Sequence, residues 1–400
     1  MFEHVHFDVS FLCKVISPWT GKEETLRLME AARCGKVSWE AVAVLANRSN
    51  LAPALRAGLR SRKLWPYAPV ELRAYLDEIY RFNERRNNYL RQQILEVVRL
   101  LNGARIIPLP FKGSAALATG LFADPAVRFM RDLDVLVPAG KLRRAVGAIE
   151  EAGRLGSEKY LTGPVSREDF YRADHFAPID REGAKASVEL HRRVVPDEWG
   201  ALLDTEDVWR ESALLGSSLF PGVSMAVMSP THQVIHCFIH SELAHGNHRD
   251  WRLDLRQLHH FAHLCMRLRD TVDWDRVASL RGDRCAGCVL GAYLHAAGKL
   301  FGVETPLSSM PDGYAKRHLS AALFLAQGRF KGLRILKDVL ARLSGCLSEQ
   351  KLKACYPREA GTSAKWRRLR RLRVLFGRYS RLRPWKEMVG AMSRRYDSLG

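Results

Sequence analysis

The chain lacks any long hydrophobic run. Its 400 residues contain no stretch of about 18 apolar side chains, which is the length that a membrane-spanning helix requires. The most apolar segment, residues 288–303, is interrupted by His295 and Lys299. The first residues also lack the basic start and apolar core of a secretory signal. We therefore expect a cytoplasmic protein without a membrane span.

A disulfide framework is missing as well. The eight cysteines are scattered without paired spacing, which is typical of a reduced intracellular protein. No Walker A, dinucleotide-binding glycine or HExxH pattern occurs, so the sequence offers no local signal for those classes. The hydrophobic share of 47% and the charged share of 26% are ordinary for globular proteins and exclude a wholly disordered chain.

Acidic residues are scarce relative to basic ones. The chain has 63 Lys and Arg against 43 Asp and Glu, which gives a formal net charge of +20. Residues 361–400 alone contain 12 basic and 2 acidic side chains, interleaved with large apolar ones such as Trp366 and Phe376. Such a segment binds nucleic acid or an anionic membrane surface, or packs its apolar side on the protein. These alternatives stay open.

Hydrophobic periodicity divides the chain into four regions. Residues 1–103 are expected to be helical and include a long amphipathic stretch over 69–101. Residues 104–228 alternate short strands with helices, which predicts an α/β unit. A second helical region, 229–347, and a basic tail, 348–400, follow. The expected fold class is α+β, with an α/β core between N- and C-terminal helical regions.

Two aspartates begin one of the predicted strands. The core is expected to contain strands at 106–110, 132–137 and 188–191 and helices at 114–121 and 142–152. Because strand side chains alternate, Asp132 and Asp134 share one face, whereas Leu133 faces the packing. Two carboxylates about 7 Å apart repel unless a cation lies between them, and Mg²⁺ prefers such oxygen ligands. The strand predicts a divalent metal site.

A turn just before the predicted helix at 114–121 supplies the phosphate-binding half of the predicted site. Gly113 allows a ligand to approach the backbone closely, and the free N–H groups of a helix start favour phosphate. Ser114 adds a hydroxyl donor. Lys112 and Arg128 would neutralise phosphate charge, the first as a point charge and the second as a fork.

Together these motifs resemble the nucleotidyltransferase superfamily of DNA polymerase beta and, more closely, bacterial nucleotidyltransferase family proteins. The resemblance spans about 30–305. Its residues form a Lys-Gly-Ser turn, an Arg…Asp-x-Asp strand and a Glu-Leu-His strand: Lys112, Gly113, Ser114, Arg128, Asp132, Asp134, Glu189 and His191.

The resemblance implies a small polymerase-beta-like core and an enzyme that transfers a nucleoside monophosphate from an NTP such as ATP to an acceptor, with release of pyrophosphate. Mg²⁺ or Mn²⁺ would be held by three catalytic carboxylates: Asp132, Asp134 and Glu189. Glu189 would also help to deprotonate the acceptor. The nucleotide would be bound by Lys112, Gly113, Ser114 and Arg128. The acceptor stays open among a small molecule, a protein and a tRNA.

The alternative is a catalytically inactive protein of this fold that binds nucleic acid or a protein partner. His191 is expected either to contact the substrate or to lie solvated at the end of its strand. Asp254 is expected to contact the acceptor, to cap a helix or to form a buried ion pair.

A further set of histidines, His232, His236 and His240, repeats on one helix face, where a packed seam is favoured over a Zn²⁺ site. The run from His240 to Glu242, with Cys285 and Cys288, imitates a zinc deaminase signature. This interpretation is disfavoured because Arg284 stands where that signature has proline.

Overall fold

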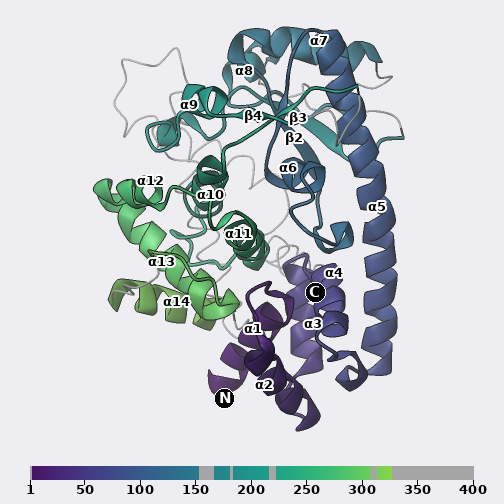
Figure 1. Ribbon diagram of the computed structural model, residues 1–400, viewed down its shortest axis with the longest axis vertical. Helices are drawn as coiled ribbons and strands as arrows, with labels where there is room; N and C mark the ends of the chain where they lie inside the picture. The colour runs from purple at the N-terminus through teal and green to yellow at the C-terminus, as the bar shows by residue number, and fades with distance from the viewer. Residues whose placement is uncertain (1, 153–165, 181–182, 216–221, 308–312, 327–400) are drawn as a thin grey trace, which may run out of the picture. The chain divides into compact units, whose positions relative to one another are not determined.

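The computed structural model describes residues 2–152, 166–180, 183–215, 222–307 and 313–326 (Figure 1). The predicted basic tail and the last part of the predicted C-terminal helical region, from 327 onward, lie outside the described residues. Residues 1–248 and 253–320 form one compact unit, to which all the contacts below belong. Among the described helices, none combines the length and the apolar character that crossing a membrane requires.

The N-terminal region is helical, as predicted. Its elements are α1 (Phe2–Ile16), α2 (Lys22–Arg33), α3 (Trp39–Arg48), α4 (Ala52–Ser61), the short 3₁₀ helix η1 (Trp65–Tyr67) and α5 (Val70–Gly103). The long amphipathic stretch is thereby confirmed as one helix, α5. Ser38 caps α3 by accepting a hydrogen bond from the backbone N–H of Ala41, which satisfies one of the free donors of that helix start.

The apolar pattern of α5 does not match its buried side at every position. Tyr75 and Phe82 belong to that pattern, yet they are 38% and 57% exposed, whereas Leu76 is fully buried. Asn83 and Asn87 lie on the buried stripe instead, where both donate side-chain hydrogen bonds to the carbonyl of Arg128. A buried amide is tolerated only when it is hydrogen-bonded, so these bonds hold the segment that leads into the aspartate strand beside α5.

The core contains a three-stranded sheet. Its strands are β1 (Leu109–Pro110), β2 (Asp132–Leu136) and β3 (Ser187–His191), in the order β1-β2-β3, with β1 antiparallel and β3 parallel to β2. A second sheet pairs β4 (Ala213–Leu214) with β5 (Ala226–Val227). The helical elements of the core are α6 (Lys112–Ala118), η2 (Pro125–Val127), η3 (Ala139–Lys141), α7 (Leu142–Ala152), α8 (Arg167–Arg172), η5 (Asp197–Trp199) and α9 (Thr205–Arg210). The fold is α+β, as expected.

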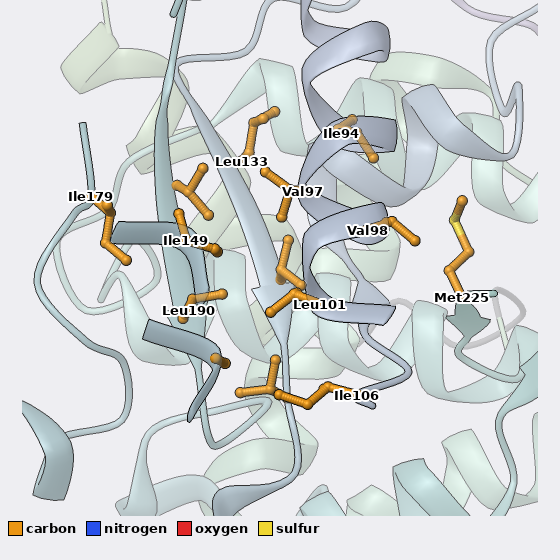
Figure 2. Close-up of a cluster of buried hydrophobic side chains, with 14 of the residues drawn as sticks. Ile94, Val97, Val98, Leu101, Ile106, Leu133, Ile149, Ile179, Leu190 and Met225 are labelled. Carbon is orange, nitrogen blue, oxygen red and sulfur yellow. The ribbon is translucent and has the colours of Figure 1, made fainter. Parts of the chain in front are cut away.

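One face of the sheet is the hydrophobic core. Leu133 on β2 and Leu190 on β3 are fully buried there, together with Val97 and Leu101 of α5 and Ile149 of α7 (Figure 2). Burying each such side chain contributes about 1.5–3 kcal/mol. Because side chains alternate along a strand, this packing leaves the intervening residues of β2 and β3 on the opposite face.

The C-terminal region is helical from Pro230, as predicted. Its elements are α10 (Pro230–Phe238), the π-helical turn η6 (Ile239–Ala244), α11 (Leu255–Leu268), α12 (Trp274–Ser279), η7 (Leu280–Gly282), α13 (Arg284–Phe301) and α14 (Gly313–Ala326). Asp254 caps α11 by accepting from the N–H of Gln257, which confirms the capping alternative. The Trp19 indole donates to the carbonyl of Ala262, 2.9 Å away, so the two helical regions contact each other. The predicted domain boundaries stay a prediction.

Candidate active site

Three carboxylates lie on the sheet face opposite the core. In the parallel pairing of β2 with β3, Asp134 stands directly opposite Glu189, and Asp132 is two residues earlier on the same strand. Residues opposite each other in a sheet project from the same face, as do residues two apart along one strand. The structure therefore brings the three sequence-predicted carboxylates together on one surface.

Asp134 has two cationic or polar partners. Its Oδ1 lies 2.7 Å from Nζ of Lys112 and 2.9 Å from Nε2 of His191, and the aspartate is only 4% exposed. Burial by itself would raise the pKa of Asp134. The Lys112 ammonium and the hydrogen bond from His191 outweigh burial and hold that pKa well below its usual range.

Asp132 is in the opposite electrostatic situation. Its burial, followed by the charges of Asp134 and Glu189, raises the pKa of this carboxyl above its ordinary value. Within the described parts of the chain it forms no ion pair. A carboxylate beside two others and without an ion-pair partner gains from a bound cation, which is the property that the metal hypothesis requires.

Glu189 is held ionised by its neighbours. Its side chain is 21% exposed, and Nε2 of His191 lies 3.7 Å from its Oε2. The His191 side chain is the largest cause of a lowered pKa of Glu189, against the opposing effects of burial and of the Asp134 charge. His175 acts in the same direction as His191.

A group of possible metal ligands overlaps the predicted set, which stays a prediction. Ligand atoms of Asp134, Glu189 and His191 all lie within 4.8 Å of one another. Among the described residues, no other group of three or more His, Cys, Asp or Glu side chains converges in this way. Asp132 is not part of the convergent group. Two carboxylate oxygens and an imidazole nitrogen fit a divalent cation, and the nitrogen suits first-row transition metals better than Mg²⁺.

His191 is a site residue rather than a solvated strand end. It is 6% exposed, and its ring packs edge-on against Phe111, with 4.8 Å between centroids. The solvated interpretation was therefore wrong. Strand alternation offered the signal, because a residue two positions after Glu189 must share its face.

His175 is the residue that sequence reasoning missed. Its isolated β-bridge to His191 brings the two rings to a centroid distance of 5.0 Å. Its Nδ1 donates a hydrogen bond to the carbonyl of Phe176, 2.9 Å away, which fixes the orientation of the ring. This position depends on a bridge between distant segments, for which the sequence contains no local signal.

Lys112 begins α6 in an unusual conformation. Its φ of +52° lies in the left-handed region, which costs a residue other than glycine about 1–3 kcal/mol. Strain of this kind persists where surrounding contacts impose it, and here Lys112 pairs with Asp134 from the neighbouring strand. The structure thus places one of the predicted nucleotide-binding residues directly at the carboxylates.

The other predicted nucleotide-binding residues lie deeper. A Cβ atom on Gly113 would come within 3.0 Å of Cγ of Met130, so this glycine makes room for core packing. Ser114 is fully buried, and its hydroxyl has no hydrogen-bond partner among the described residues. Arg128 is 6% exposed and forms no ion pair within the described residues. Their role in binding nucleotide stays a prediction.

The histidines on one face of α10 pack in the interior beside the site, which is the alternative that the sequence favoured over a Zn²⁺ site. His232 is fully buried and His236 is 4% exposed, and the His236 ring lies 5.3 Å from that of Phe111. Burial is the largest cause that lowers the pKa of His236, to about 3, which keeps the imidazole neutral. Cys285 and Cys288 are exposed on α13 and join no convergent metal group within the described residues, so the deaminase interpretation has no support.

Comparison with known proteins identifies a family. A family model described as an uncharacterised nucleotidyltransferase matches residues 35–302, a range that contains the sheet, all three carboxylates and the histidine helix. Neither the curated proteins nor the solved structures gave a match. The matched range covers more than half of the chain and supports nucleotidyl transfer as the general reaction class. The chain belongs to this uncharacterised nucleotidyltransferase family.

Proposed function

We propose that this protein is a metal-dependent enzyme that transfers a nucleoside monophosphate from an NTP to an acceptor and releases pyrophosphate. The observation that carries the proposal is the position of Asp132, Asp134 and Glu189 on one face of the β2–β3 pair. The order of a Lys-Gly-Ser turn, an Asp-x-Asp strand and a later glutamate supports a polymerase-beta-like core of the bacterial type. A cytoplasmic location, where NTPs are available, is part of the proposal.

The residues present fit a divalent cation. Asp134, Glu189 and His191 supply converging ligand atoms, and the raised pKa of Asp132 marks an excess of negative charge beside them. When bound, Mg²⁺ or Mn²⁺ supplies Lewis-acid stabilisation of charge on the phosphoryl oxygens. Asp134 would have to exchange its present partners for the cation, because its Oδ1 now contacts Lys112 and His191.

The remaining roles follow from position. Glu189 accepts the proton of the acceptor hydroxyl, because it is the most accessible carboxylate whose pKa is held low. The acceptor oxygen attacks the α-phosphorus, and the bond from that phosphorus to the pyrophosphate oxygen breaks. Lys112 binds a phosphate oxygen of the NTP, together with the more deeply placed Gly113, Ser114 and Arg128.

A transfer assay tests the proposal. Purified protein is incubated with each α-³²P-labelled NTP, with Mg²⁺ or Mn²⁺ and a cell extract, and label is followed into protein, RNA and small molecules. We expect label in one fraction with wild type and with Asp270→Asn, whose side chain is 94% exposed, but none with Asp134→Asn. Equal labelling by Asp134→Asn and wild type would disprove the site.

One observation favours the second candidate, a core without catalytic turnover. The Lys112 ammonium already pairs with Asp134, and so takes the place of a cation there, while His191 donates a hydrogen bond to the same oxygen. Such a protein would act by binding nucleic acid, an anionic membrane surface or a protein partner. It predicts salt-dependent RNA binding that is lost on deletion of 361–400 and is unchanged in Asp134→Asn.

A further inference from the structure

A small pocket with a mostly apolar surface lies next to the carboxylates, between α6, α10 and α11. Its polar side chains are Lys112, Arg128, Gln233, His236, His240, Gln257 and His260. The volume of about 30 Å³ holds one or two water molecules or a group of a few atoms, and is too small for a nucleoside. The pocket is therefore a place for one polar group of a ligand.

Arg128 is a buried cation without a counter-ion. It is 6% exposed, and one of its terminal nitrogens donates to the carbonyl of Phe129, 3.1 Å away. Its Nε has no hydrogen-bond partner, and no described residue forms an ion pair with the guanidinium. Asp254 and Asp132 act on this charge electrostatically but form no ion pair with it. A buried charge without a direct partner is costly, so an anion in contact with the guanidinium would stabilise the fold.

The other pocket groups are suited to an anion as well. Nδ1 of His260 is buried without a hydrogen-bond partner, and this residue is 6% exposed. A neutral imidazole donates one hydrogen bond, and the Gln257 amide offers two further N–H groups. None of the lining residues is acidic.

We propose that this pocket is an oxyanion subsite, in which one carboxylate or phosphoryl group pairs with Arg128 and accepts hydrogen bonds from His260 and the Gln257 amide. Lys112 lines the pocket and also pairs with Asp134, so the bound group lies beside the carboxylate site. Two sources share this chemistry: a phosphate of the NTP, or an anionic group on the acceptor. The inference rests on the unpaired buried charge and holds whether or not the core turns over.

Thermal unfolding with and without oxyanions tests the subsite. The midpoint of wild type is measured while inorganic phosphate or acetate replaces sodium chloride at constant ionic strength. We expect a saturable rise for wild type and for Arg131→Met, which removes an exposed arginine three residues away. Arg128→Met should show no saturable rise. A larger effect of phosphate indicates a phosphoryl ligand, and a larger effect of acetate a carboxylate on the acceptor.

A second variant keeps the test decisive if Arg128→Met does not fold. Ala116 lines the pocket and is 3% exposed, so Ala116→Val narrows the cavity while Arg128 stays in place. It should also lose the response to oxyanions. The proposal is overturned if every folded variant responds as wild type does, or if wild type does not respond. Asp134→Asn should keep the response, which separates this result from the proposed transfer activity.

Discussion

Nζ of Lys112 lies 2.7 Å from Oδ1 of Asp134, and both side chains are largely shielded from water. The pair joins the first residue of α6 to the middle of β2. It gives the acidic face of the sheet an internal positive charge in addition to the hydrogen bond from His191. Any cation that binds Asp134 must therefore compete with Lys112, and this competition makes the pair a direct probe of the site.

Lys112→Met should destabilise the metal-free protein by about 3–5 kcal/mol, because it leaves a buried carboxylate without its main counter-charge. Mn²⁺ should restore part of the loss, since a ligand that binds only the folded state stabilises it. Urea unfolding with and without Mn²⁺ measures both effects. Lys36→Met, which removes an exposed lysine, is the control. Equal unfolding free energies for Lys112→Met and wild type would contradict the prediction.

Asp134→Asn and His191→Phe should each weaken Mn²⁺ binding at least about 10-fold, because each removes a converging ligand atom. Asp132→Asn should weaken it less, since its carboxylate lies outside that group. Isothermal titration calorimetry measures the affinities without any need for an acceptor. An equal loss in Asp132→Asn and Asp134→Asn would favour the ligand set inferred from the sequence, in which Asp132 binds the metal, over the group that includes His191.

Acid should destabilise the protein through His236. Its pKa is about 3 in the folded state, against 6.5 ordinarily, so between these values the unfolded chain binds a proton that the folded protein does not. Stability from this group is complete above pH 6.5 and falls by about 1.4 kcal/mol per pH unit as the pH drops toward 3. His236→Phe should reduce the slope by that amount in urea unfolding from pH 7 to 4. An unchanged slope would show that the imidazole is already protonated.

Glu242 should act with the opposite sign. It is 7% exposed, and burial is the main cause that raises its pKa from 4.5 to about 7, against the opposing hydrogen bond from Ser241. The folded protein therefore holds a proton that the unfolded chain releases, and stability is lost as the pH rises from 4.5 through 7. Glu242→Gln should be more stable than wild type at pH 8 by roughly 3 kcal/mol. Equal stability at pH 8 would refute the assigned protonation.

The local pattern predicted three elements of the core closely and two less well: β1 is only Leu109–Pro110 instead of 106–110, and α6 is Lys112–Ala118 instead of 114–121. Helix α7 has the predicted bounds, and β2 and β3 each lie within one residue of theirs. Alternation along β2 predicted that Asp132 and Asp134 share a face, and the register with β3 adds Glu189. These features depend on neighbours two to four residues apart, which periodicity reports directly.

The buried stripe of α5 and the surroundings of Arg128 were not predictable in this way. Phe82 is apolar yet exposed, whereas Asn83 is polar yet buried, because the segment before β2 supplies carbonyl partners for the amide. Arg128 was expected to neutralise phosphate charge, and that role stays a prediction. Its burial against α10 and α11, which follow it by more than a hundred residues, had no local signal.

The amino-acid sequence by itself determined the alternating strand that displays the two aspartates, the helices around it and the family to which the chain belongs. Only the tertiary structure decided which groups meet there: Lys112 on Asp134, His191 beside Glu189, and Arg128 in a pocket of histidines. The reason is physical. Secondary structure follows from local spacing, whereas the charge balance of a buried site depends on groups that come together only when the chain folds.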